Sequence, residues 1–108
     1  MPSVLVNRYA VFFYFPVDGK VAEPISREPS LLMAVESSVS TYRATGHVSY
    51  LIEDQRKGRQ FVVDRDVLLR LLFLKRNDRT RYFEILNRLD RVGNQEELVS
   101  FLVAHARI

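Results

Sequence analysis

The first apolar segment of the chain alternates between two faces and predicts a β-strand over Val4–Phe15. The strand is rich in valine, phenylalanine and tyrosine, and Pro16 ends it. Its odd positions from Tyr9 onward would lie on one face, and the even positions Ala10, Phe12 and Tyr14 on the other. Because both faces are apolar, we expect this strand to be central in a sheet and covered on both sides.

The next segments are marked by residues that start and stop regular structure. Residues 17–28 predict a loop, in which Asp18-Gly19 could close a hairpin to a short strand near Val21. Pro29–Ala44 predicts a helix, because its apolar residues recur at near-helical spacing and Gly46 suits the position after a helix end. The serines and threonines of this segment are poor helix formers, so a strand is the alternative for residues 30–44.

The second half of the chain predicts a hairpin followed by three helices. His47–Asp54 and Gln60–Val63 alternate as strands around a turn in which Gly58 supplies a positive φ. The helices are expected over Arg65–Arg76, Arg79–Val92 and Gln95–Ala106, with Asp64, Asp78 and Asn94 as their N-caps. The first of them is apolar on nearly every side, so it is expected to be buried all round.

Together these elements predict an α+β fold. A small antiparallel sheet, made of the N-terminal strand and the 47–63 hairpin, would pack with the C-terminal helices. The length of 108 residues suits one domain spanning residues 1–108 and suffices to bury a core.

Composition excludes several classes of protein. Without cysteine there is no disulfide scaffold, thiolate zinc site or cysteine nucleophile. The apolar runs fall well short of the ~20 residues that span a bilayer, and Tyr9–Phe15 lacks the small-residue cleavage site of a signal peptide. We therefore expect a cytoplasmic protein with no membrane partner.

Residues that could carry catalysis have simpler explanations. The chain has no Gly-rich phosphate loop and no nucleophile or metalloprotease motif. His47 stands at a strand start and His105 in the last turn of a helix, where it complements the helix dipole. The acidic pairs Asp64/Asp66 and Glu96/Glu97 stand in first helical turns, where the dipole favours them. We expect no catalytic residue, no metal, no cofactor and no enzymatic activity.

The net charge of +3 is concentrated in residues 51–91, which hold 11 basic and 7 acidic residues. Two basic features stand out as candidate binding sites for nucleic acid or for an acidic partner. One is the hairpin tip, with Arg56, Lys57 and Arg59, and the other is a helix junction, with Lys75, Arg76, Arg79 and Arg81. Arg79 and Arg81 stand at the start of the helix expected over Arg79–Val92, where the helix dipole disfavours cations. This cost hints at a functional reason for the two arginines.

These observations favour a small interaction protein without enzymatic activity, such as an adaptor, an inhibitor or modulator, or an assembly subunit. The protein would act through protein–protein contacts and is expected to be a homodimer, because one chain of this length can barely cover its own apolar faces. The alternative is a nucleic-acid-binding protein that uses the 56–59 tip and the 75–81 junction. Salt dependence separates the two, since phosphate-dominated binding weakens steeply with salt.

Overall fold

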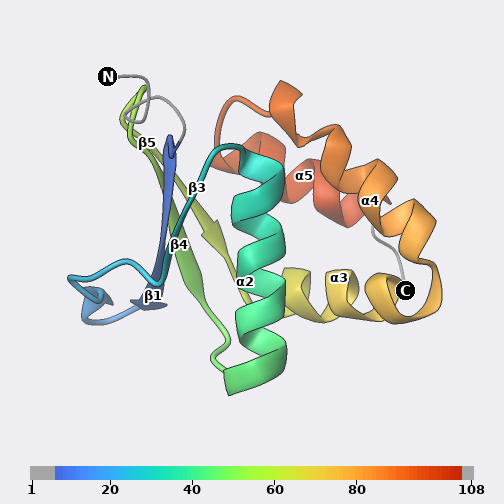
Figure 1. Ribbon diagram of the computed structural model, residues 1–108, viewed down its shortest axis with the longest axis horizontal. Helices are drawn as coiled ribbons and strands as arrows, with labels where there is room; N and C mark the ends of the chain where they lie inside the picture. Colours follow the sequence, from blue (N-terminus) through green and yellow to red (C-terminus); the bar gives the residue numbers. More distant parts are fainter. Residues whose placement is uncertain (1–6, 106–108) are drawn as a thin grey trace.

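A five-stranded antiparallel sheet forms one layer of the protein in the computed structural model, which describes residues 7–105 (Figure 1). Strand β1 (Tyr9–Phe15) is central, and β4 (Tyr50–Asp54) pairs with one of its edges. The short strands β2 (Gly19–Lys20) and β3 (Ser26–Glu28) share its other edge. Strand β5 (Arg59–Val63) completes the hairpin with β4 and ends the sheet. The predicted first strand and hairpin are confirmed, but both begin later than predicted: β1 starts at Tyr9, and β4 starts at Tyr50 instead of His47. Residues 4–6 lie outside the described range.

The segment predicted as a loop over residues 17–28 contains two strands instead. Asp18-Gly19 does turn the chain back on β1, with Gly19 at a φ of 89°. The backbone N–H groups of Val21 and Ile25 then bond to β1 carbonyls, while residues 22–24 loop out between them. Pro24 has no N–H to donate, so it interrupts this edge strand without ending it, and pairing resumes at Ser26.

The helix predicted after the loop is confirmed as α2 (Leu31–Thr45), which rules out the strand alternative. The Ser30 hydroxyl caps it by accepting from the Met33 N–H at 3.2 Å, and Gly46 ends it at a φ of 78°. Its serine and threonine residues are accommodated because some bond within the helix. Ser38, for example, donates to the Ala34 carbonyl at 3.0 Å.

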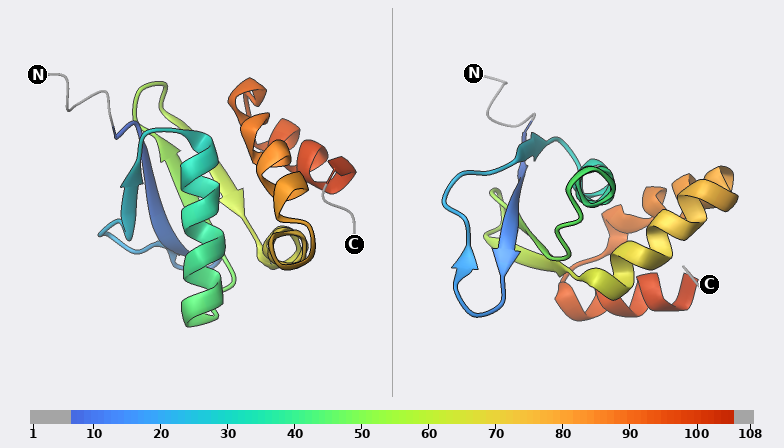
Figure 2. Two further views of the ribbon diagram at one scale, coloured as in Figure 1. Left: turned by 45° about the vertical axis from the view of Figure 1, so that its right-hand side comes forward. Right: turned by 90° about the horizontal axis from the view of Figure 1, so that it is seen from below.

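The remaining helices all lie with α2 on one side of the sheet, called here the inner face (Figure 2). They are α3 (Arg65–Asn77), α4 (Arg79–Asn87), a 3-10 turn η1 (Leu89–Arg91) and α5 (Gln95–His105). The helix predicted over residues 79–92 is therefore too long: α4 ends at Asn87 and the chain tightens into η1. Asp64, Asp78 and Asn94 act as N-caps as expected, while Ala106 lies outside the described residues. The α+β class, with an antiparallel sheet and C-terminal helices, is confirmed.

The main core lies between the inner face and the helices. Its largest fully buried side chains come from α2, the sheet and the C-terminal helices, and include Leu31, Tyr50, Phe61, Leu68, Leu71, Tyr82 and Leu86. The opposite, outer face of the sheet carries no helix within residues 7–105. Ala10, Phe12 and Leu51 nevertheless form a small buried cluster there, with the Lys20 ammonium 4.0 Å from the centre of the Phe12 ring.

Helix α5 is attached to the free edge of the sheet by one amide side chain. Gln95 accepts a hydrogen bond from the Val62 N–H at 2.6 Å and donates one to the Val62 carbonyl at 3.0 Å. The side chain thus imitates the pairing of a further strand. It satisfies backbone groups of β5 that would otherwise offer an edge to another chain.

The sequence predicted that helix α3 is buried on all sides, and this prediction is wrong. Leu68 and Leu71 are fully buried, but 40% of Leu69 and 46% of Phe73 are exposed. Helices α2, α4 and α5 pack against α3, and an apolar stripe with Leu69 and Phe73 remains exposed. Within the described residues, no helix has the length and apolar character needed to cross a membrane.

Candidate functional site

The basic residues predicted at the hairpin tip divide into two groups in the structure. Arg56 and Lys57 are exposed in the turn between β4 and β5. Arg59 instead turns inward, where it forms an ion pair with Asp54 at 3.2 Å and donates to the Gly93 carbonyl. Arg59 therefore holds the hairpin against the start of α5 and is not part of an open basic surface.

The predicted helix junction is also partly occupied by internal contacts. Lys75 forms an ion pair with Glu36 of α2 at 2.7 Å, and the second Glu36 oxygen accepts a hydrogen bond from the Tyr82 hydroxyl. Arg79 lies over the Phe83 ring, and Arg81 donates to the His105 carbonyl at 3.1 Å. Burial and the neighbouring Glu36 carboxylate both raise the pKa of Tyr82 above its ordinary value, so this phenol stays protonated as a donor.

The contact between Tyr82 and Glu36 predicts a structural role for this network. Tyr82→Phe should lower the free energy of unfolding by about 1–2 kcal/mol, because it removes a hydrogen bond to a charged acceptor. Tyr42→Phe is the matched control, since the Tyr42 hydroxyl faces an open cleft, and it should cost less than about 0.5 kcal/mol. Urea denaturation of both variants measures the difference, and equal costs would contradict the assignment.

The two predicted basic features do not form one surface. The hairpin tip lies at the upper left of Figure 1 and the α3–α4 junction at the lower right, on opposite sides of the molecule. Of the seven predicted residues, Arg76 lines a cleft together with the basic side chains of Arg43 and Arg65.

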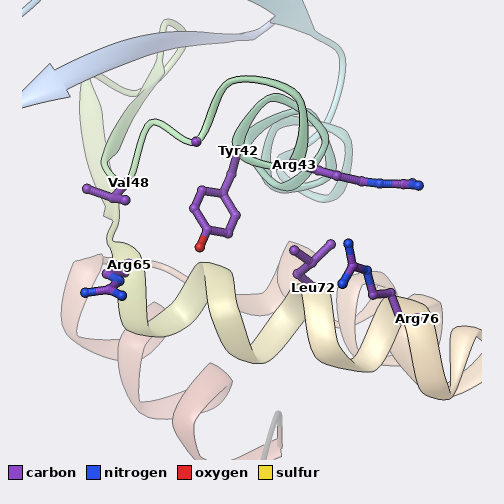
Figure 3. Close-up of a pocket in the computed structure, with 7 residues that line it drawn as sticks. Tyr42, Arg43, Val48, Arg65, Leu72 and Arg76 are labelled. Atoms are coloured by element: carbon purple, nitrogen blue, oxygen red, sulfur yellow. The ribbon is translucent and has the colours of Figure 1, made fainter.

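That cleft lies between the end of α2 and the exposed side of α3, and has a volume of about 470 Å³. Tyr42 descends from α2 with its hydroxyl toward α3, between Arg65 at one end and Arg76 with Arg43 at the other (Figure 3). Leu72 and Val48 supply apolar lining. A second hollow of about 360 Å³ shares Leu72 and Arg76 and extends the cleft along α3, where its lining adds Leu69, Phe73 and Asn77. We call the two together the α3 groove.

The charges around the α3 groove are all positive. Within residues 7–105, Arg43, Arg65 and Arg76 have no acidic group within ion-pair distance and are exposed. Arg43 stands in the last turn of α2, where the dipole favours it. Arg65 opens α3, where the dipole disfavours a cation. The groove therefore combines an apolar floor with three arginines that take part in no ion pair among the described residues.

Sequence reasoning found Arg76 but missed the rest of the groove. The position of Arg65 in a first helical turn was an available signal, of the same kind that marked Arg79 and Arg81. Arg43 gave no such signal, because the helix dipole favours a cation in the last turn of a helix. Leu69 and Phe73 were predicted to be buried, and nothing in an uninterrupted apolar run shows which of its members stay exposed.

The lining of the groove consists of arginine, apolar, tyrosine, glycine and asparagine residues. It has no histidine and no carboxylate to serve as a general base. Both histidines lie elsewhere and bond to backbone carbonyls: His47 to that of Tyr14 at 3.1 Å and His105 to that of Phe101 at 2.9 Å. Within the described part of the chain, no three histidine or acidic side chains gather as metal ligands would.

Comparisons of the chain with protein-family models, with curated proteins and with solved structures found no match.

Proposed function

We propose that this chain is a non-enzymatic interaction protein that binds another protein through the α3 groove. The observation that carries the proposal is the exposed apolar stripe of α3, with Leu69 and Phe73 beside a cleft rimmed by arginines. Such a protein would serve as an adaptor, an inhibitor or modulator, or an assembly subunit, and we place it in the cytoplasm.

The physical reason is the combination of apolar anchors with a rigid support. Leu68, Leu71 and Leu74 bury the opposite side of α3, so the helix presents Leu69 and Phe73 in fixed positions. Binding then costs little conformational entropy in α3, and most of the favourable binding free energy comes from apolar area removed from water. Arginine at the edge of such a patch is typical of protein interfaces.

The homodimer expected from the sequence receives less support than a different partner. A two-fold symmetric contact through the groove would bring Arg65 and Arg76 of one copy against the same arginines of the other. The strand face that motivated the dimer also buries Ala10 and Phe12 within the chain itself. Sedimentation equilibrium at tens of micromolar tests this directly: a species of 12.6 kDa is the monomer, and about twice that mass is the dimer.

Nucleic acid is the weaker alternative because of how the predicted residues are placed. Arg59 and Lys75 are held by Asp54 and Glu36, and the remaining predicted cations are divided between two ends of the molecule. A phosphate backbone would also leave the apolar floor of the groove uncovered. Affinity for DNA or RNA at about 50 mM salt, where phosphate contacts are strongest, would favour this alternative.

The proposed function predicts that peptides bind in the groove. Selection of a random peptide library displayed on phage, with the full chain immobilised, should enrich binders that the double variant Leu69→Glu/Phe73→Glu loses. Val99→Glu/Val103→Glu is the matched control, because these α5 residues form a second exposed apolar pair at the same spacing. Circular dichroism melts verify that both variants fold.

Either of two results would refute the proposed function. One is a selection that enriches nothing above the background of an immobilised control protein. The other is a set of binders that Leu69→Glu/Phe73→Glu retains and Val99→Glu/Val103→Glu loses.

A further inference from the structure

The arginines of the groove are arranged along one line of α3. Arg65, Leu69, Leu72 and Arg76 follow one another at spacings of four, three and four residues, which places them on a single stripe of the helix. At a rise of 1.5 Å per residue the stripe is about 16 Å long. Cations thus stand at both ends of a straight apolar strip, and Arg43 of α2 adds a third beside Arg76.

We propose that the α3 groove binds an acidic amphipathic helix of a partner protein. The helix would lie along α3 for about three turns, with leucine-like residues in the middle and carboxylates about 11 residues apart facing Arg65 and Arg76. This inference rests on the proposed function and specifies the partner's chemistry.

Charge complementarity indicates that the partner carries negative charge where it meets the groove. Arg43, Arg65 and Arg76 line the groove, where they repel one another and attract carboxylates from a ligand. Asp64 and Asp66 flank Arg65 in the sequence, but Asp66 pairs with Arg70 and Asp64 caps α3. The guanidinium group also suits carboxylates geometrically, because its fork of donors can hold both oxygens. A partner with cations at these positions would be rejected by the same field.

The shape of the groove selects a helix over a flat surface. Leu69, Leu72 and Phe73 form ridges at helical spacing, into which the side chains of a second helix at positions i, i+3 or i+4, and i+7 can interdigitate. The recess under Tyr42 lies between α2 and α3, where a convex object fits. A bilayer surface, in contrast, would contact the outer edges of the two helices and leave Val48 and Leu72 uncovered.

The test uses a displayed library of 16-residue peptides with leucines fixed at helical spacing and with every other position allowed to be glutamate or lysine. Selection on the wild-type chain should enrich glutamate over lysine at least threefold at positions that flank the leucines. Selection on Arg65→Glu/Arg76→Glu should reverse the preference toward lysine. Arg56→Glu/Lys57→Glu is the matched control, because it changes the net charge equally at the far hairpin tip and should keep the glutamate preference.

Binding of one enriched peptide measures the same effect in solution. Fluorescence anisotropy should show Kd about tenfold weaker for Arg65→Glu/Arg76→Glu, and about unchanged for Arg56→Glu/Lys57→Glu, at low salt. The difference should shrink at 0.5 M salt, because exposed charges are screened.

Several outcomes would overturn this inference. They are equal glutamate and lysine frequencies, lysine enrichment on the wild-type chain, an unchanged preference on Arg65→Glu/Arg76→Glu, or no binders from the helical library. The inference would also be overturned if the chain bound a DNA duplex, or vesicles of phosphatidylserine and phosphatidylcholine, more tightly than the selected peptides. This holds if Arg65→Glu/Arg76→Glu abolishes that binding. If the random library still yields groove binders in these cases, the proposed function stands and only the acidic helix is refuted.

Discussion

Leu68→Ala and Leu71→Ala are each expected to lower the free energy of unfolding by about 2–5 kcal/mol. Both side chains are fully buried where α3 meets the sheet and the other helices. Truncation removes apolar contacts and leaves a cavity that the packed surroundings fill only in part. Urea denaturation followed by circular dichroism measures the loss.

The neighbouring leucine of the same helix provides the control. Leu69 is 40% exposed, so Leu69→Ala should cost less than about 1 kcal/mol. A loss below about 1 kcal/mol at both Leu68 and Leu71 would show that α3 is peripheral to the core. A loss at Leu69 equal to that at Leu71 would show that the exposed stripe is covered in solution.

Asp54→Asn is expected to destabilise the protein by about 2–3 kcal/mol at neutral pH, because it removes the charge at the centre of a buried cluster. The Asp54 carboxylate is inaccessible to solvent and accepts two bonds from Arg8, each of 2.7 Å, and one from Arg59 of 3.2 Å. It also accepts from the backbone N–H groups of Arg56 and Lys57 in the hairpin turn. The two arginines are partly exposed, which keeps the expected loss below that of a fully buried pair.

The same cluster predicts how stability depends on pH. The hydrogen bonds from Arg8 hold the pKa of Asp54 well below its ordinary value of 3.8, with smaller contributions from the turn N–H groups and Arg59. A lowered pKa in the folded state gives stability that is present above about pH 4 and is lost as the pH falls below that value. Wild-type stability should therefore approach that of Asp54→Asn progressively as the pH falls from about 4 to 2, and the loss continues until the lowered pKa is passed. A difference that stays constant over this range would contradict the role of the charge.

Several features of this protein follow from the sequence because their causes are local. Asp64, Asp78 and Asn94 precede helices and cap them, since each side-chain oxygen accepts from a backbone N–H three residues on and needs no distant partner. Gly46 ends α2 for the same kind of reason, through a positive φ that glycine adopts without strain. Alternating and helical apolar spacing similarly determined the hairpin, the central strand and the α+β class.

The candidate site depended on tertiary structure, because its residues come from segments that only the fold brings together. Which apolar residues of α3 remain exposed depends on where α2, α4 and α5 pack, and no local pattern distinguishes Leu69 from Leu68. Whether a cation is free also depends on groups far along the chain: the Glu36 carboxylate holds Lys75 across 39 positions, and the Gly93 carbonyl holds Arg59 across 34. The sequence by itself determined where cations and apolar residues occur. Long-range packing decided which of them are used inside the fold and which stay exposed, as Arg43, Arg65 and Arg76 do.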